Sequence, residues 1–148
     1  MSALKTRIND DVKSAMRKQD KELLATLRLI LAALKQKEVD ERIELDDTQV
    51  LGILDKLAKQ HRDSISQFKA AGRSDLVSKE ESELAVVLGY MPAPLSESEI
   101  EQLIRSAITE CGAQGMKDMG KVMAILKPGV QGRTDMGKLS ARVKLLLA

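Results

Sequence analysis

The sequence has very few of the residues that build redox, metal or disulfide centres. Its 148 residues include one cysteine, Cys111, and one histidine, His61. A lone cysteine excludes an internal disulfide and fits a reducing compartment, so we expect a cytoplasmic protein. Zinc sites usually need three or four His, Cys or acidic ligands, and the sequence neighbours of His61 supply no second one. We therefore predict no metal or other cofactor, with His61 at the surface or at the boundary of the core.

The sequence also lacks a recognisable set of residues for catalysing hydrolysis. A Ser-His-Asp triad could use only His61, and no G-x-S-x-G segment is present. Glu80 and Glu81 are adjacent in a helical stretch, so they point to different faces and are predicted to be solvated charges. With no nucleophile and base to pair, we expect no intrinsic enzymatic activity.

Aromatic residues and long apolar runs are also scarce. Phe68 and Tyr90 are the only aromatic residues, which argues against a platform that stacks single-stranded bases. No stretch approaches the ~20 apolar residues of a membrane helix, and the first residues lack the apolar core of a signal peptide. We expect neither a membrane protein nor a secreted one.

The charge that is present is unevenly distributed along the chain. The net charge is +2, but residues 113–148 hold 7 basic and 2 acidic groups, whereas residues 1–112 hold 17 basic and 20 acidic groups. This asymmetry favours two modules, with a C-terminal one able to contact a polyanion. A solvated, lysine-rich surface is the alternative interpretation.

Apolar residues recur with helical spacing through the first part of the chain. Four stripes run over residues 4–16, 23–39, 50–68 and 76–88. Asp20 is the expected N-cap of the second helix, residues 45–48 start the third, Gly72 ends it, and Ser74 or Asp75 caps the fourth. Helices with such short connections indicate an antiparallel bundle over residues 1–91.

A second, smaller module is predicted to follow. Pro92 and Pro94 prevent helix continuation, so residues 92–94 form the linker and Tyr90 is expected to anchor the two modules, with its hydroxyl in solvent. Ser96 and Glu99 form a capping box for a helix that ends at Gly112. Two more helices are expected, over 117–126, stopped by Pro128, and over 135–147. The fold class is therefore all-α, with a three-helix module over 95–148.

Basic residues of this module form the candidate site. Gly115 and Gly120 permit close backbone approach, and Asp118 is the expected N-cap of the helix that follows it. The proposed phosphate contacts are Lys117, Lys121, Lys127, Arg133, Lys138 and Arg142. In the alternative interpretation the acids are caps, the methionines are core residues and the glycines are turns.

Three stretches resemble the stand-alone YqeY family, namely residues 28–39, 72–92 and 120–137. The same domain forms the C-terminal tail of GatB, a subunit of the tRNA-dependent aspartyl/glutamyl amidotransferase. The resemblance implies a helical bundle followed by a small three-helix module. It also implies a part in holding tRNA, and an association with carbon–nitrogen ligase activity that uses glutamine as amido-nitrogen donor.

Two functions of different classes follow from these observations. The first is a non-catalytic protein that binds tRNA through shape and phosphate contacts. The second is a protein–protein interaction module that assists an amidotransferase or another enzyme linked to translation, with an adaptable methionine surface. The methionines of that surface would be Met116, Met119, Met123 and Met136.

Overall fold

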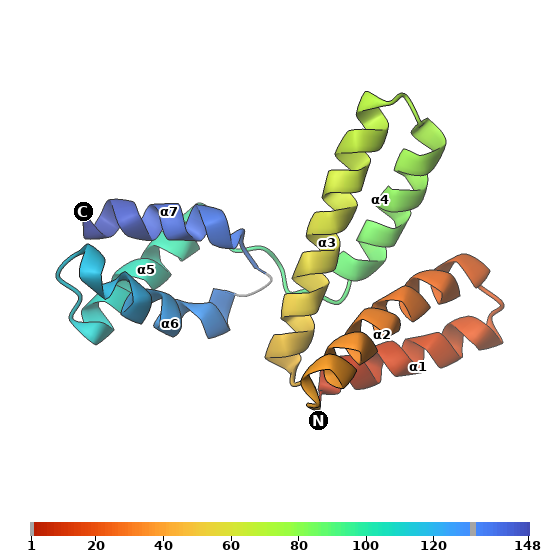
Figure 1. The fold of residues 1–148 in the computed structure, drawn as a ribbon, viewed down its shortest axis with the longest axis horizontal. Helices are drawn as coiled ribbons and strands as arrows, with labels where there is room; N and C mark the ends of the chain where they lie inside the picture. Colours follow the sequence, from red (N-terminus) through yellow and green to blue (C-terminus); the bar gives the residue numbers. More distant parts are fainter. Residues whose placement is uncertain (1, 131–132) are drawn as a thin grey trace. The chain divides into compact units, whose positions relative to one another are not determined.

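The protein is all-helical and consists of two compact units (Figure 1). The computed structural model describes residues 2–130 and 133–148, and these contain seven α-helices and one short 3-10 turn. The all-α prediction is confirmed. Unit 1 comprises Met1–Met91 and unit 2 comprises Pro92–Ala148. No helix in the described part of the chain is both long enough and apolar enough to cross a membrane.

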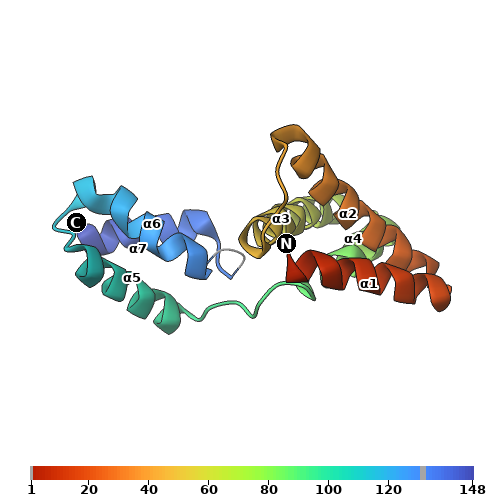
Figure 2. The same cartoon turned by 90° about the horizontal axis from the view of Figure 1, so that it is seen from below.

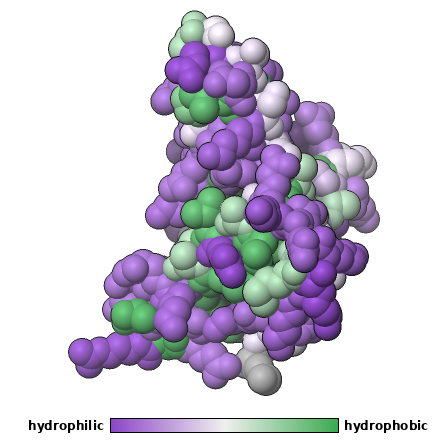
Figure 3. Space-filling view, turned by 90° about the vertical axis from the view of Figure 1, so that its right-hand side faces the viewer, coloured by the Kyte–Doolittle hydropathy of each residue, from purple (hydrophilic) through white to green (hydrophobic). Residues whose placement is uncertain are grey.

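Unit 1 is built from two antiparallel helical hairpins. The first pairs α1 (Ala3–Arg17) with α2 (Lys21–Glu41), and the second pairs α3 (Asp47–Ala70) with α4 (Ser74–Leu88). The hairpins meet at one end and diverge from there, so the far end of α3 and α4 extends away from α1 and α2 (Figures 1 and 2). On the side of unit 1 seen in Figure 3, apolar side chains reach the surface among polar ones.

The core of unit 1 follows the spacing of its apolar residues. Leu27, Ile30 and Leu34 on α2 lie three and four residues apart, and all are buried against α1, α3 and α4. Val50 and Leu54 meet them from α3. Each fully buried leucine or isoleucine contributes about 2 kcal/mol of transfer free energy. This burial holds the two hairpins together where they meet.

Three of the four helix starts in unit 1 are capped by side chains. Ser2, Asp20 and Asp46 each accept a hydrogen bond from a backbone N–H in the first turn. The expected cap of α4 by Ser74 or Asp75 is wrong. Gly72 turns the chain with φ of 70°, and the cap position falls on Arg73, whose side chain instead pairs with Asp75 at 3.2 Å.

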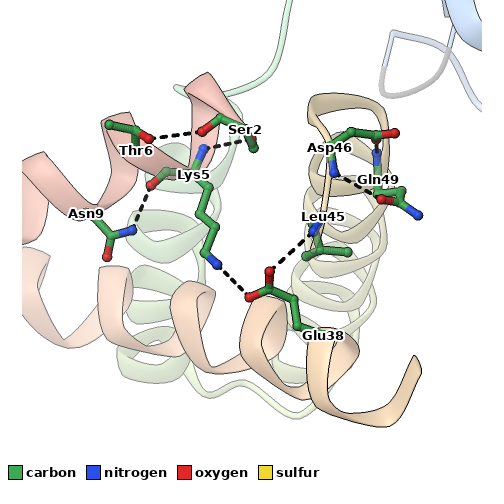
Figure 4. A network of polar contacts seen from close by, with 8 residues as sticks. All are labelled: Ser2, Lys5, Thr6, Asn9, Glu38, Leu45, Asp46 and Gln49. Atoms are coloured by element: carbon green, nitrogen blue, oxygen red, sulfur yellow. Dashed lines mark hydrogen bonds and ion pairs between the residues drawn. The ribbon is translucent and has the colours of Figure 1, made fainter. Parts of the chain in front are cut away.

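A polar network joins α1, α2 and the start of α3 (Figure 4). Lys5 Nζ donates to Glu38 Oε1 at 2.6 Å, while the backbone N–H of Leu45 donates to Glu38 Oε2 at 3.3 Å. These hydrogen bonds, first that of Lys5 and then that of Leu45, hold the pKa of Glu38 below its ordinary value. Nearby, the Ser2 hydroxyl donates to Asp47. The network fixes where the first hairpin meets the second.

Tyr90 belongs to the core of unit 1. Its side chain is 8% exposed, and its hydroxyl donates to Asp11 Oδ2 at 2.5 Å, so the expectation of a solvated hydroxyl is wrong. The guanidinium of Arg7 lies 4.9 Å from the ring centroid. Burial, and then the hydrogen bond to Asp11, raises the pKa of Tyr90. Tyr90 thereby ties the end of α4 to α1.

Unit 2 is a three-helix unit with its own core. It contains α5 (Glu97–Cys111), the 3-10 turn η1 (Met116–Asp118), α6 (Met119–Val130) and α7 (Met136–Leu147). Ile104, Val122 and Val143, one from each α-helix, are fully buried. The capping box of Ser96 and Glu99 forms as the sequence predicts.

The sixth helix differs from its predicted bounds at both ends. Lys117 lies in the 3-10 turn, and the helix runs through Pro128 to Val130 instead of stopping at the proline. Pro128 falls in the last turn, where it removes one backbone donor near the end of the helix. Val130 is buried in the core of unit 2, which keeps that turn in place.

Candidate nucleic-acid interface

The predicted phosphate contacts come from four consecutive segments of unit 2. Lys117 lies on η1, Lys121 and Lys127 on α6, and Lys138 on α7, and all four are exposed. Arg133, before α7, and Arg142, on α7, are partly buried. The four lysines are therefore available to an external partner, whereas the two arginines also contact their own unit.

The geometry of the helices groups some of these residues and separates others. Lys138 and Arg142 are four residues apart on α7 and share a face. Lys121 and Lys127 are six residues apart on α6, which places their side chains about 120° apart around a helix of 3.6 residues per turn. The lysines of α6 thus do not form one row.

Asp118 organises the turn before α6. Its Oδ2 accepts from the backbone N–H of Gln114 at 3.0 Å, and its Oδ1 lies 3.7 Å from Lys121 Nζ. The Gln114 hydrogen bond, followed by the charges of Lys121 and Lys117, lowers the pKa of Asp118. The expected N-cap of α6 is therefore wrong, because this carboxylate accepts from a residue that precedes it. It also offsets part of the charge of the two lysines.

The two arginines link segments of unit 2. Arg133 Nε donates to the carbonyl of Ala93 at 3.1 Å, and the Arg133 carbonyl accepts from Leu95 N–H at 2.9 Å. Arg142 lies 3.8 Å from Glu101 on α5. Because Arg105 and then Arg142 stabilise its charged form, Glu101 has a lowered pKa. Both arginines thus support the fold as well as carrying charge.

Charge is segregated within unit 2. The α5 segment, residues 97–111, carries four acidic residues and one basic one, whereas residues 113–148 have a net charge of +5. The division between acidic and basic sequence therefore falls after α5, inside unit 2, and not at the division between the units. Within the unit, α6 and α7 supply the positive charge.

Three glycines between α5 and the end of α6 leave the backbone around them accessible. An added Cβ at Gly115, Gly120 or Gly129 would meet nothing within 4 Å, and none of the three has the positive φ that favours glycine. Packing within the chain does not require glycine at these positions. The open backbone suits close approach by an external chain.

The methionines are divided between core and surface. Met119, Met123 and Met136 pack against the core of unit 2, while Met116 is 47% exposed. The core interpretation therefore accounts for three of the four. Of the four methionines proposed for a docking surface, Met116 is thus the one that is exposed.

Outside this interface, a histidine and two glutamates meet in unit 1. His61 Nδ1 on α3 lies 2.6 Å from Glu80 Oε2 and 3.8 Å from Glu83 Oε2, both on α4. The exposed fractions of the three side chains are 17%, 20% and 14%. The prediction that His61 lacks a nearby ligand is wrong, as is that of a solvated Glu80.

The sequence does contain a signal for this cluster. His61 and Glu83 each lie eleven residues from Gly72, the turn of an antiparallel hairpin, so they stand at the same height. Glu80 lies three residues before Glu83 and shares its helix face. A search confined to the sequence neighbours of His61 could not find them.

Comparison with known proteins gives a consistent family match. The family model described as "Yqey-like protein" matches residues 5–147. A protein of Pyrenophora tritici-repentis, named "Altered inheritance of mitochondria protein 41, mitochondrial", is 35% identical over 79% of this chain and 65% of its own length. Proteins with the same name from Lachancea thermotolerans and Saccharomyces cerevisiae are 36% and 33% identical, over 70% and 68% of this chain.

These relatives correct the expected location. Each is named as a mitochondrial protein, which contradicts the prediction of a cytoplasmic one. The lone cysteine excluded an internal disulfide but does not distinguish one reducing compartment from another. The match spans 65%, 57% and 56% of the length of the three relatives.

Proposed function

The chain belongs to the YqeY-like protein family, and we propose that it is a non-catalytic protein that binds structured RNA, tRNA in particular, through α6 and α7. One observation carries the proposal. Residues 113–148 hold a net charge of +5, and their lysines at 117, 121, 127 and 138 are exposed. The resemblance to the tail of GatB supplies tRNA as the candidate RNA.

The mode of binding follows from the residues available. Lysine ammonium groups contact phosphates as point charges, and they bind without reading the sequence. Phe68 and Tyr90 both lie in unit 1, so unit 2 has no aromatic ring on which to stack a base. Recognition would therefore rest on the shape and backbone of a folded RNA. The open backbone at Gly120 and Gly129 would let that RNA approach closely.

A second candidate is a protein–protein contact with an amidotransferase or another translation-linked enzyme. Leu145 on α7 favours it, because its side chain is 76% exposed. Leu145 lies three residues after Arg142 and seven after Lys138, so an apolar group sits on the same face as two cations. Replacing Leu145 by serine should weaken such a protein contact and leave RNA binding unchanged.

A salt titration tests the RNA proposal. The affinity of the full chain for bulk tRNA would be measured by fluorescence anisotropy at several salt concentrations, for the wild type, Lys127→Ala and Lys138→Ala. Because each phosphate contact releases counterions, each substitution should reduce the slope of log affinity against log salt by about 1. Lys56→Ala is the matched control, because Lys56 is an exposed helical lysine of unit 1.

Two outcomes would contradict the proposal. Absence of tRNA binding at low salt would exclude it outright. Binding whose slope is the same for the Lys127, Lys138 and Lys56 variants would show that α6 and α7 do not contact the phosphates.

A further inference from the structure

The cluster of His61, Glu80 and Glu83 has the composition of a metal site. Its three potential ligand atoms, one imidazole nitrogen and two carboxylate oxygens, all lie within 4.8 Å of one another. His61 comes from α3, and the two glutamates come from one face of α4. Bundles build their metal sites in this way, from side chains on facing helices, often with ligands three residues apart.

The charges in the cluster are not balanced by its own members. Two carboxylates face one imidazole, which brings one positive charge at most. The three side chains are 80% or more shielded from solvent, so the excess negative charge is only partly hydrated. A divalent cation would balance both carboxylates and leave the imidazole neutral, the form in which it binds metals.

The distances suit coordination after small movements. Ligand atoms about 2.1 Å from a tetrahedral metal ion are about 3.4 Å from each other. The separations here are 2.6 Å between His61 and Glu80 and 3.8 Å between His61 and Glu83, one shorter and one longer than that value. In the proposed site, rotation of the glutamate side chains would bring both distances toward that value.

Glu83 also borders an open space. A surface hollow of about 290 Å³ is lined by Glu83 and Lys79 of α4 and by Thr26 of α2, among others. Three protein ligands leave a tetrahedral ion one further position, which water fills in such sites. The hollow reaches one of the three potential ligands, Glu83.

We propose that His61, Glu80 and Glu83 bind one divalent transition-metal ion, with Zn²⁺ preferred over Mg²⁺. The imidazole selects against Mg²⁺, which prefers oxygen ligands, whereas zinc accepts nitrogen and carboxylate oxygen together. The ion would join α3 to α4 midway along their hairpin. This site lies in unit 1 and does not depend on RNA binding by unit 2.

Calorimetry on the full chain, first freed of metal with a chelator, tests the site. Titration of the wild type with Zn²⁺ alone should show one ion bound per chain, and Mg²⁺ should give no such binding. His61→Ala and Glu83→Gln should each weaken Zn²⁺ binding by more than about tenfold, since each removes a ligand. Glu81→Gln is the matched control, because Glu81 is next in sequence, exposed and paired with Lys69. It should bind Zn²⁺ like the wild type.

Cobalt provides a second readout that does not depend on the stability of the variants. Co²⁺ added to the wild type should produce visible absorption bands that Zn²⁺ abolishes by displacement, and Glu80→Gln should change those bands. Circular dichroism would show that each variant is folded. The proposal is overturned if the wild type binds no Zn²⁺, or if folded His61→Ala binds it as tightly as the wild type. In either case the three side chains form a hydrogen-bonded cluster and no metal site.

Discussion

The two units differ in the reach of their polar contacts. In unit 1, four hydrogen bonds between side chains join residues 19 to 79 positions apart, in addition to local ones such as Gln36 with Asp40. The pairs are Ser2 with Asp47, Lys5 with Glu38, His61 with Glu80 and Tyr90 with Asp11. In unit 2, most hydrogen bonds that involve a side chain, including those donated by backbone N–H groups, join residues two to four positions apart, at caps and within helices. Unit 1 is therefore specified by polar pairs as well as by its apolar core.

This difference explains why unit 2 has charged side chains that are available to an external partner. Most polar contacts of side chains among the described residues of unit 2 are local, while Arg133 with Ala93 and Arg142 with Glu101 join more distant segments. The exposed lysines of α6 and α7 are consequently not needed to position one helix against another. In unit 1, by contrast, Lys5 and Glu38 hold helices in place, so their charges serve the fold.

The largest expected effect is the loss of stability when a core residue of either unit is truncated. Leu54 in unit 1 and Ile104 in unit 2 are both fully buried, and replacing either by alanine should cost about 3 kcal/mol of unfolding free energy. Both aromatic residues lie in unit 1, so tyrosine fluorescence reports on that unit, while circular dichroism reports on both. In urea, Leu54→Ala should shift the fluorescence transition, and Ile104→Ala should shift only a dichroism component. Equal shifts of both signals in both variants would show that the units unfold together.

A smaller effect tests the long-range polar contacts of unit 1. Tyr90→Phe removes the hydroxyl that donates to Asp11 and leaves this carboxylate without it. We expect a loss of about 1–2 kcal/mol of unfolding free energy, measured by urea denaturation followed by circular dichroism. Asp11→Asn, which keeps an acceptor for the hydroxyl, should cost less. A Tyr90→Phe variant as stable as the wild type would show that this contact does not help to specify unit 1.

The smallest expected effect is the dependence on pH of the stability that Glu38 contributes. The pKa of Glu38 is lowered in the folded state from an ordinary value of 4.5, so the unfolded chain binds more protons as the pH falls below that value. The stability that Glu38 contributes is complete above pH 4.5 and is lost as the pH falls through the folded pKa. Glu38→Gln should therefore be less stable than the wild type at pH 7, by a margin that shrinks toward pH 3.

Tyrosine fluorescence in urea at both pH values would measure that margin. Glu99→Gln is the comparison in unit 2, where the pKa of Glu99 is lowered by Ser96. It should leave the tyrosine signal unchanged and move only the dichroism signal. A margin for Glu38→Gln that stays constant with pH would contradict the assignment.

Much of the helical content could be predicted, because helical spacing and caps are local. Asp20, Asp46 and Ser96 cap helices as their sequences indicate, and the apolar stripes face the cores. The errors occur where tertiary contacts decide. Pro128 was expected to stop α6, but the burial of Val130 continues it. Tyr90 was expected to keep a solvated hydroxyl, but Asp11, 79 positions away, accepts its hydrogen bond.

The candidate sites show the same limit. Sequence indicates how much positive charge unit 2 carries, but the direction of each side chain depends on helix phase, which separates Lys121 from Lys127. The cluster around His61 was missed because its members lie on two helices. In the sequence alone, its two glutamates look like the solvated charges of an exposed helix. Only the pairing of α3 with α4 shows that they lie opposite a histidine.

The position of the turn at Gly72 determines which residues of α3 lie opposite which residues of α4. It therefore places His61 opposite Glu83. One residue inserted into α3 between His61 and Gly72 would rotate the imidazole by about 100° around the helix axis and raise it by about 1.5 Å. The helix would still form, yet the three side chains would no longer converge. An insertion or deletion that a surface loop accepts readily would here separate the histidine from both carboxylates.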